Sequence, residues 1–171
     1  WAAVSAGNLE KLWLPDGGQT VSGRGYEQGG EISPGDGAGL TDVLAGLVRC
    51  NDSHVADGRP VGDPMEAALL VLATKGGLDP ATVRAEADRV DEVPFDSAHK
   101  FMATVHRVEG ELRLEVKGAP DVLLARCSSA SDAERAAMGA EVERMAEGGM
   151  RVIALATRLL TDAELAAVPD P

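Results

Sequence analysis

Apolar and polar residues alternate most regularly in two neighbouring segments, residues 101–108 and 111–117. Both are rich in β-branched residues, and Glu109-Gly110 between them has the composition of a tight turn, so the pattern predicts a β-hairpin. A two-residue turn places Met102 opposite Lys117 and divides the ribbon into a polar side and an apolar side. We expect the apolar side to face the core. The apolar side holds Phe101, Ala103, Val105, Leu112, Leu114 and Val116, and the polar side holds Lys100, Thr104, His106, Arg113, Glu115 and Lys117.

Two lysines of the polar side, Lys100 and Lys117, become diagonal neighbours across this ribbon. Like charges at that spacing repel each other unless an anion or a carboxylate lies between them. One interpretation is therefore an anion-binding site. The other is that Glu115 neutralises the pair on a solvated sheet face, and periodicity alone favours this second interpretation because exposed charge clusters are common on protein surfaces.

The clearest helix-start signal is the segment Asp63-Pro64-Met65-Glu66. Asp63 is suited to cap the helix, Pro64 to occupy its first position, and Glu66 to reach back to the N–H of the capping residue. We expect this helix to end at Gly76-Gly77. Asp79-Pro80 repeats the opening and predicts a second helix to about Val90, so that residues 63–90 form a helical hairpin packed on the sheet.

The rest of the chain supplies shorter elements around these two hairpins. Helical spacing predicts a helix over residues 40–50 with Thr41 as its N-cap. We further expect strands near residues 11–14, 20–22 and 150–159, helices over residues 120–127, 131–147 and 161–169, and loops over residues 26–39 and 51–59. The predicted fold class is α+β, an antiparallel β-sheet flanked by helical hairpins, in a single domain of residues 1–171.

Composition narrows the classes of partner. The net charge of −12 and the pI near 4.6 argue against a general nucleic-acid or anionic-membrane surface, which needs a broad basic face. No apolar run reaches the 18 residues of a membrane span, so we expect a chain that is not inserted in a membrane. We also expect a monomer. Cys50 and Cys127 are expected as reduced thiols. Cys50 and His54 are spaced like half a metal site, but no second pair follows, and no metal site is predicted.

Four motifs resemble the nucleotide-binding (N) domain of P-type cation-transporting ATPases, in its calcium-pump-like branch. Their order and spacing agree with the family, and residues 21–26 resemble the start of the domain, so the resemblance covers nearly the whole chain. The heavy-metal branch has a His-Pro pair, which the three histidines here lack. The motifs are Gly62-Asp63-Pro64-Met65-Glu66-Ala67-Ala68-Leu69, Pro94-Phe95-Asp96-Ser97 with Lys100, Lys117-Gly118-Ala119-Pro120-Asp121, and Gly149-Met150-Arg151-Val152-Ile153-Ala154-Leu155-Ala156.

The resemblance implies a binding site for ATP, taken up as Mg-ATP. It implies that Phe95 stacks on the adenine, that Glu66 bonds the adenine edge directly or through water, and that Lys117 lies deep beside the nucleotide. A base offers a π-face that an aromatic ring holds for about 1–3 kcal/mol, and ammonium and guanidinium groups suit phosphate oxygens. The expected ATP-binding set is completed by Lys100 at the phosphates, Arg151 along the ribose and phosphates, and Ser97 and Gly118 within the same motifs. Met65 stands where the family usually has a hydroxyl residue.

Each of these residues also has a purely structural interpretation. Phe95 could anchor the core after Pro94, because large apolar residues are mostly packing residues. Glu66 could close a capping box. Lys117 could pair with Glu115, Arg151 could be a solvated strand residue, and Gly118 could only help to turn the chain into the next helix.

Missing motifs limit the expected activity. The phosphorylated aspartate of the family lies in Asp-Lys-Thr-Gly-Thr, which does not occur here, so the resemblance implies no catalytic residue in this chain. It implies instead a cytoplasmic fragment of a larger membrane pump that binds ATP and ADP and works with the phosphorylation and actuator domains of its parent. Two other functions stay open: a non-catalytic acidic domain that docks a protein partner, and a free-standing hydrolase.

Overall fold

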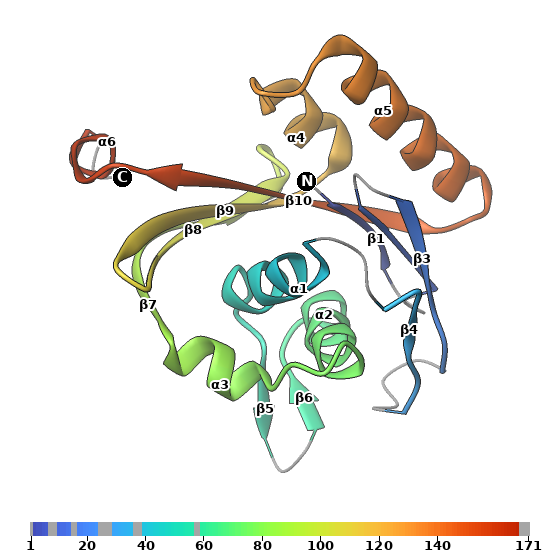
Figure 1. The fold of residues 1–171 in the computed structure, drawn as a ribbon, viewed down its shortest axis with the longest axis horizontal. Coiled ribbons are helices and arrows are strands. Elements are labelled where there is room, and N and C mark those ends of the chain that lie inside the picture. Colours follow the sequence, from blue (N-terminus) through green and yellow to red (C-terminus); the bar gives the residue numbers. More distant parts are fainter. Residues whose placement is uncertain are drawn as a thin grey trace.

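An eight-stranded antiparallel sheet organises the protein (Figure 1). The computed structural model describes residues 2–6, 10–14, 17–23, 29–35, 39–56 and 59–167. The sheet has the strand order β4-β3-β2-β1-β10-β9-β8-β7, and a separate two-stranded ribbon pairs β5 with β6. The bounds are β1 Ala2–Ala6, β2 Lys11–Leu14, β3 Gly17–Val21, β4 Ile32–Ser33, β5 His54–Ala56, β6 Arg59–Val61, β7 Ala87–Asp96, β8 Phe101–Val108, β9 Glu111–Gly118 and β10 Arg151–Leu160.

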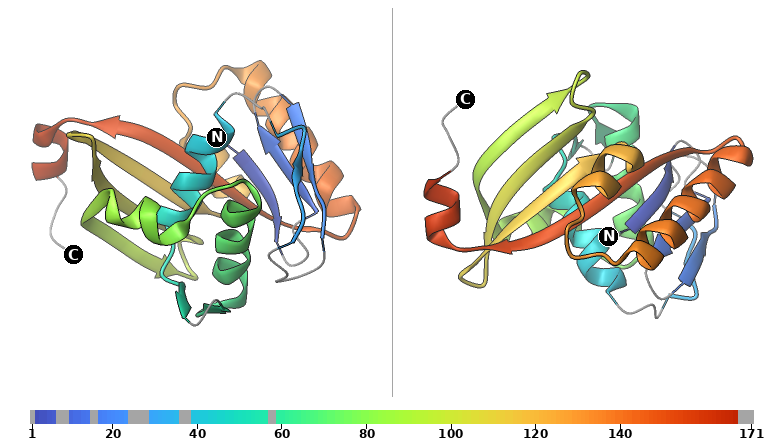
Figure 2. Two further views of the ribbon diagram at one scale, coloured as in Figure 1. Left: turned by 60° about the horizontal axis from the view of Figure 1, so that its bottom comes forward. Right: turned by 90° about the horizontal axis from the view of Figure 1, so that it is seen from above.

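Helices cover both faces of this curved sheet. In Figures 1 and 2, α1, α2 and α3 lie inside the curve, whereas α4 and α5 lie against its outer face beside β10. The last helix, α6, follows the far end of β10. The bounds are α1 Leu40–Arg49, α2 Pro64–Lys75, α3 Pro80–Ala85, α4 Pro120–Arg126, α5 Asp132–Glu147 and α6 Asp162–Ala166. Within the described ranges, no helix has the length and apolar character needed to cross a bilayer.

The main core lies between the sheet and helices α1 and α2. Every residue of α2 from Ala67 to Ala73 is buried, and Leu44 and Leu47 of α1 are fully buried against it. Leu155 of β10 and Met102 of β8 close the core from the sheet. Because apolar burial contributes about 25 cal/mol per Å², this layer fixes the start of α2 and the adjacent strand ends relative to each other.

Several sequence predictions are confirmed, the α+β class among them. The hairpin has the predicted register, with Met102 opposite Lys117 and Val108 opposite Glu111. Asp63 caps α2 as predicted, because its carboxylate accepts hydrogen bonds from the backbone N–H groups of Met65 and Glu66. The other helix starts also hold: Pro120 begins α4, and capping boxes begin α5 at Ser131 with Glu134 and α6 at Thr161 with Glu164.

The predicted helix to Val90 is wrong beyond Ala85. Residues 87–96 form the edge strand β7, which pairs with β8 from Ala87 opposite Val108 to Asp96 opposite Phe101. The Asp79-Pro80 opening is correct, and the Asp79 side chain accepts from Thr82 N–H. Pairing with an existing strand supplies backbone hydrogen bonds that a short isolated helix could not match, so tertiary structure decides the segment.

Smaller differences concern a cap and three strands. Thr41 lies inside α1, whose N-cap is Gly39 in the left-handed region at φ 80°. Parts of the two predicted loops are strands: β4 lies within residues 26–39, and β5 with the start of β6 lies in the segment predicted as the loop 51–59. These strands have two or three residues each, which is too short for a periodic signal.

The prediction that the apolar side of the hairpin faces the core is confirmed for Ala103, Val105 and Leu112, which are buried, but the interpretation of the polar side as a solvated sheet face is wrong. The polar side packs against the helices, and Thr104, His106, Glu115 and Lys117 are all buried there. Among the described residues of the hairpin, Met102 on this same side is the one that joins the main core. Alternation shows which residues share a side, but helices cover both faces of this sheet, so both sides of the hairpin are buried, and the helices carry charged partners for the polar side.

Candidate functional site

A cavity of about 550 Å³ opens between the N-terminus of α2 and the adjoining ends of β7, β8, β9 and β10. Strands β8 and β9 bring their residues here as a paired hairpin, and β10 adds its first residues from the other side of β9. Eight of the fourteen lining residues are uncharged and supply apolar walls, and the other six are charged, so the cavity offers both kinds of contact to a small molecule. The lining residues are Asp52, Asp63, Met65, Glu66, Leu69, Phe95, Lys100, Met102, Lys117, Gly118, Ala119, Arg151, Val152 and Ile153.

Phe95 lines this cavity and is 63% exposed. Its place results from an irregular pairing of β7 with β8, in which Val93 pairs with Ala103 and the next matched residue is Asp96 opposite Phe101. Such bulges redirect side chains at the end of a strand. The interpretation of Phe95 as a core anchor is therefore wrong, because most of its surface is free to contact a ligand.

A buried ion pair forms the floor of the cavity. Lys117 Nζ lies 2.6 Å from Glu66 Oε1, and Lys117 is only 6% exposed. The second oxygen of Glu66 accepts from the backbone N–H groups of Asp52 at 3.0 Å and Ser53 at 3.2 Å. Glu66 therefore does not close the predicted capping box, because its carboxylate oxygens bind Lys117 and the loop after α1 instead.

The proposed neutralisation of the two lysines by Glu115 is also wrong. Glu115 is fully buried and forms its ion pair with Arg49 of α1, whose Nε donates at 2.7 Å. The thiol of Cys50 lies beside it, 3.5 Å from the backbone oxygen of Glu115, and burial raises the pKa of this thiol to about 11. The pairing partners of the hairpin thus come from the helices, which leaves Lys117 to Glu66.

Two cations at the mouth of the cavity, Lys100 and Arg151, form no ion pair and donate no side-chain hydrogen bond within the described residues. Both are exposed. Lys100 has φ 60°, in the left-handed region that is unfavourable for a residue with a Cβ atom. Its backbone is held on both sides, since its N–H donates to Asp96 O at 2.7 Å and its carbonyl accepts from Ala119 N–H at 2.9 Å.

Asp96 builds the turn that carries Lys100. Its carboxylate accepts from the N–H of Ala98 at 2.7 Å and lies 2.9 Å from Nδ1 of His99. These contacts, the Ala98 N–H first, lower the pKa of Asp96. The turn therefore keeps a charged acceptor at neutral pH, and the ammonium of Lys100 is presented from a defined backbone.

Six of the seven predicted site residues line the one cavity, and Ser97 does not. Ser97 lies in the exposed turn between β7 and β8. Gly118 has a structural reason besides the cavity, because a Cβ atom there would lie 2.4 Å from the backbone oxygen of Lys100. Whether these residues bind ATP stays a prediction.

Four residues of the site were not predicted from the sequence: Asp52 and Ser53, whose backbone N–H groups hold Glu66, and the apolar wall residues Leu69 and Met102. The helical pattern of apolar residues could have indicated Leu69. Asp52 and Ser53 act through backbone N–H groups, which every residue except proline has, so their side chains gave no signal. Among the residues that the structure describes, no three His, Cys, Asp or Glu side chains gather in a way that could hold a metal ion.

Comparison with known proteins agrees with the motifs. Residues 39–169 match the family described as P-type ATPase, cytoplasmic domain N. A cation-transporting ATPase, pma1, of Synechocystis is 35% identical over 161 residues, and a calcium-transporting ATPase of Bacillus subtilis is 36% identical over 165 residues. These alignments cover 81% and 83% of this chain and 18% of each relative.

The chain thus spans about a fifth of the length of these relatives. A shorter alignment, of 87 residues at 41% identity, links half of the chain to calcium-transporting ATPase 1 of Lactococcus lactis. The family match covers most of the sequence, including the residues around the cavity. The chain belongs to the family of cytoplasmic N domains of P-type ATPases.

Proposed function

We propose that this domain binds Mg-ATP in the 550 Å³ cavity and presents it to the phosphorylation domain of a P-type cation pump. The proposal includes no catalysis by this chain alone, because its sequence lacks Asp-Lys-Thr-Gly-Thr. Its contribution would be positioning, which is the larger part of what proteins supply to phosphoryl transfer. In the parent protein, the domain would lie at the cytoplasmic face of the membrane and act together with the phosphorylation and actuator domains.

The observation that carries the proposal is the division of the cavity into an aromatic wall, a buried charged floor and a cationic mouth. The exposed ring of Phe95 is available for stacking on a base. Lys100 and Arg151 have no anionic partner within the described residues and are available to phosphate oxygens. Apolar walls such as Leu69 and Ile153 suit the body of a nucleoside.

Lys117 is assigned a different task from that of Lys100. Its ammonium is already bound to Glu66 at 2.6 Å inside the cavity. Taking Lys117 away from Glu66 would leave a largely buried carboxylate without its counter-charge, which is costly. We therefore assign the phosphates to Lys100 and Arg151, and the base and ribose to the Lys117–Glu66 floor.

Affinity of the isolated domain should be low. One stacking contact and two or three charged contacts must offset several kcal/mol of association cost, which leaves on the order of −4 kcal/mol, a millimolar constant. Release of ADP would benefit from such weak binding.

A titration of the ¹⁵N-labelled chain with Mg-ATP, followed by NMR, tests the proposal. The expected result is a set of saturable shifts at the amides of Phe95, Lys100 and Lys117. Absence of shifts up to about 20 mM Mg-ATP, well above a millimolar constant, would contradict it and would favour an acidic domain that docks a protein partner. The same samples, assayed for released phosphate, should show no turnover, and turnover abolished by Lys117→Ala would instead identify a free-standing hydrolase.

A further inference from the structure

Residues 48–53, which comprise the end of α1 and the segment after it, border the nucleotide cavity and a second hollow. This second hollow has a volume of about 440 Å³ and lies between the end of α1, α3 and β7. Asp52 lines both. Unlike the nucleotide cavity, the second hollow is lined mostly by charged and polar side chains: Arg49, Asn51, Asp52, Arg84, Asp88, Arg89 and His106, with Ala87.

Two arginines grip the backbone of this segment from the side of the second hollow. Arg84 of α3 donates to the carbonyl of Val48, from Nε and Nη2 at 3.3 Å each, and to the carbonyl of Asn51 at 2.8 Å. Arg89 of β7 donates from Nη2 to the carbonyls of Arg49 at 3.0 Å and Asn51 at 3.1 Å. We call this arrangement the arginine clasp.

The clasp does more than cap α1. Capping explains the contacts with Val48 and Arg49, whose carbonyls lie in the last turn and lack helical partners. It does not explain why both guanidinium groups converge on the carbonyl of Asn51, beyond the end of the helix. Bringing the two cations together is unfavourable, and burial, followed by the charge of Arg89, lowers the pKa of Arg84.

The peptide bond at which the arginines converge also contacts the nucleotide cavity. The Asn51–Asp52 peptide is trans, so its C=O and its N–H point in opposite directions. The carbonyl accepts from the clasp, and the N–H donates to Glu66 Oε2 at 3.0 Å. Hydrogen bonds from cations polarise a peptide and strengthen its N–H as a donor. The clasp therefore strengthens the contact that holds Glu66, which in turn holds Lys117 at 2.6 Å.

The position of Arg89 depends on an irregular pairing in β7. Arg89 pairs with His106, the next matched residue is Asp91 opposite Val105, and Val90 is the extra residue between them. Residues three apart on a regular strand lie on opposite sides. The bulge instead leaves Arg89 and Glu92 on one side, where Arg89 Nη1 donates to Glu92 at 2.7 Å and to Asp52 at 2.8 Å. These carboxylates hold the guanidinium in place.

We propose that Arg84 and Arg89 are positioning residues of the nucleotide site, which act through the Asn51–Asp52 peptide on Glu66. Neither arginine lines the nucleotide cavity, so neither would touch the ligand. The inference rests on the proposed function for its consequence in binding. Its structural part, the control of the Glu66 contacts by the clasp, does not depend on a nucleotide.

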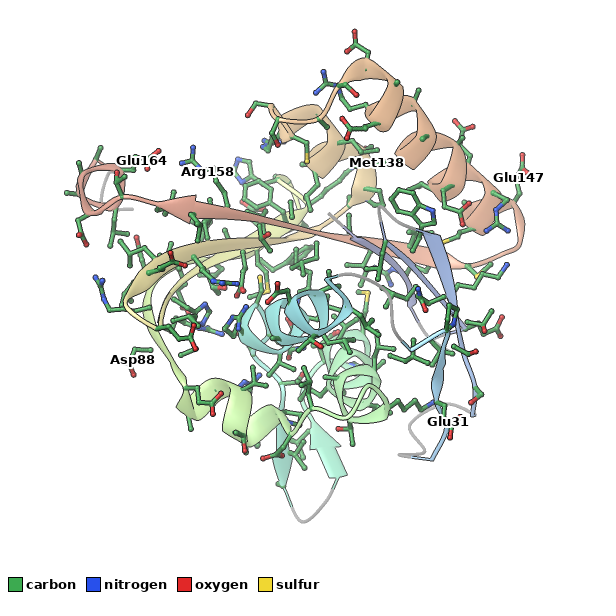
Figure 3. The ribbon with its side chains drawn as sticks, viewed as in Figure 1. Glu31, Asp88, Met138, Glu147, Arg158 and Glu164 are labelled. Atoms are coloured by element: carbon green, nitrogen blue, oxygen red, sulfur yellow. The ribbon has the colours of Figure 1, made fainter. Side chains whose placement is uncertain are left out.

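Hydrogen exchange of the ligand-free chain tests the structural part. Arg89→Ala and Arg84→Ala should each speed exchange at the amides of Asp52 and Ser53, whereas Arg158→Ala should not. Arg158 is the matched control because its own ion pair, with Glu164 at 3.2 Å, lies at the far end of β10 from the cavity (Figure 3). Unchanged protection of Asp52 and Ser53 in both clasp variants would overturn the inference, whatever the nucleotide does.

Nucleotide titrations test the route through Glu66. Arg89→Ala should weaken Mg-ATP binding about three- to tenfold, as coupled neighbouring residues commonly do, and should have no further effect in an Glu66→Gln background. Equal losses in the two backgrounds would overturn the inference. Arg89→Lys keeps the charge but not the planar fork, so it should lose as much affinity for Mg-ATP as Arg89→Ala. The lysine variant also replaces the alanine variant in the titration if the alanine variant does not fold. Full binding by the lysine variant would argue against a clasp. If the unmodified chain does not bind Mg-ATP, the proposed function fails while the exchange experiment still decides the clasp.

Discussion

The exposed ring of Phe95 gives the sharpest prediction, because the chain has only one other phenylalanine, Phe101, in a different setting. Phe95→Ala should remove a contact with the nucleotide while costing the fold little. Phe101 is half-buried and has the guanidinium carbon of Arg126 5.1 Å above its ring. Phe101→Ala should therefore do the reverse.

The magnitudes follow from exposure. Phe95 is 63% exposed, so about a third of the roughly 200 Å² of an aromatic side chain is buried, and at about 25 cal/mol per Å² its loss costs at most about 1–2 kcal/mol of unfolding free energy. A domain with a stability of about 5–15 kcal/mol remains folded after such a loss. Loss of stacking should weaken Mg-ATP binding by about 1–3 kcal/mol, or about 5- to 150-fold.

Two measurements on the unmodified chain and three variants check this prediction. Urea unfolding gives the free energy of unfolding, and NMR titration with Mg-ATP gives the dissociation constant. We expect Phe95→Ala to lose binding and to remain folded, Phe101→Ala to lose stability and to retain binding, and Phe95→Trp to restore binding. Binding by Phe95→Ala within twofold of the unmodified chain, or an equal loss in Phe101→Ala, would refute the stacking argument.

Four further predictions concern the lysines and the thiols. Lys100→Ala and Lys100→Gly should weaken Mg-ATP binding equally. The glycine variant should be the more stable of the two by about 1 kcal/mol, since only glycine relieves the strain of φ 60°. A thermal unfolding experiment in which the alanine variant is more stable than the glycine variant would disprove this strain. Lys117→Ala should lower the free energy of unfolding by about 2–4 kcal/mol, because it leaves the buried carboxylate of Glu66 without its counter-charge. The double variant Lys117→Ala with Glu66→Ala should recover part of that loss. Purely additive losses in the free energy of unfolding would exclude the coupling of the two residues. Burial raises the pKa of Cys50 from 9.0 to about 11, so the unfolded chain loses this proton first and stability should fall as the pH rises from about 9 to about 11. At pH 8 a thiol reagent should label half-buried Cys127 before Cys50, and equal labelling rates in the folded chain would contradict the burial.

Local signals in the sequence predicted much of the architecture. A capping residue and its partner lie three positions apart, as Ser131 and Glu134 do, and Asp63 with Pro64 starts α2 at the predicted residue. The tight turn Glu109-Gly110 fixed the register of the hairpin across to Met102 and Lys117. Interactions of this range depend on neighbouring residues, so the sequence alone determined them.

The motif resemblance extended the prediction to the site. It identified six residues that the fold brings around one cavity, although they come from α2, β7, the turn before β8, β9 and β10. Ser97, the seventh predicted residue, does not line the cavity. A motif indicates which segment lies near a site, but it does not fix the direction of each side chain.

Tertiary structure alone decided that the polar side of the hairpin is buried and which of its charges pair. Lys117 could choose between Glu115 and Glu66, and the fold brings it to Glu66, 51 residues away, while Arg49 takes Glu115 across 66 residues. The segment after Ala85 became the strand β7, because β8 offered it an edge. Such choices depend on packing between distant segments, where the cost of an unpaired buried charge exceeds any local preference, and that cost does not exist until the chain has folded.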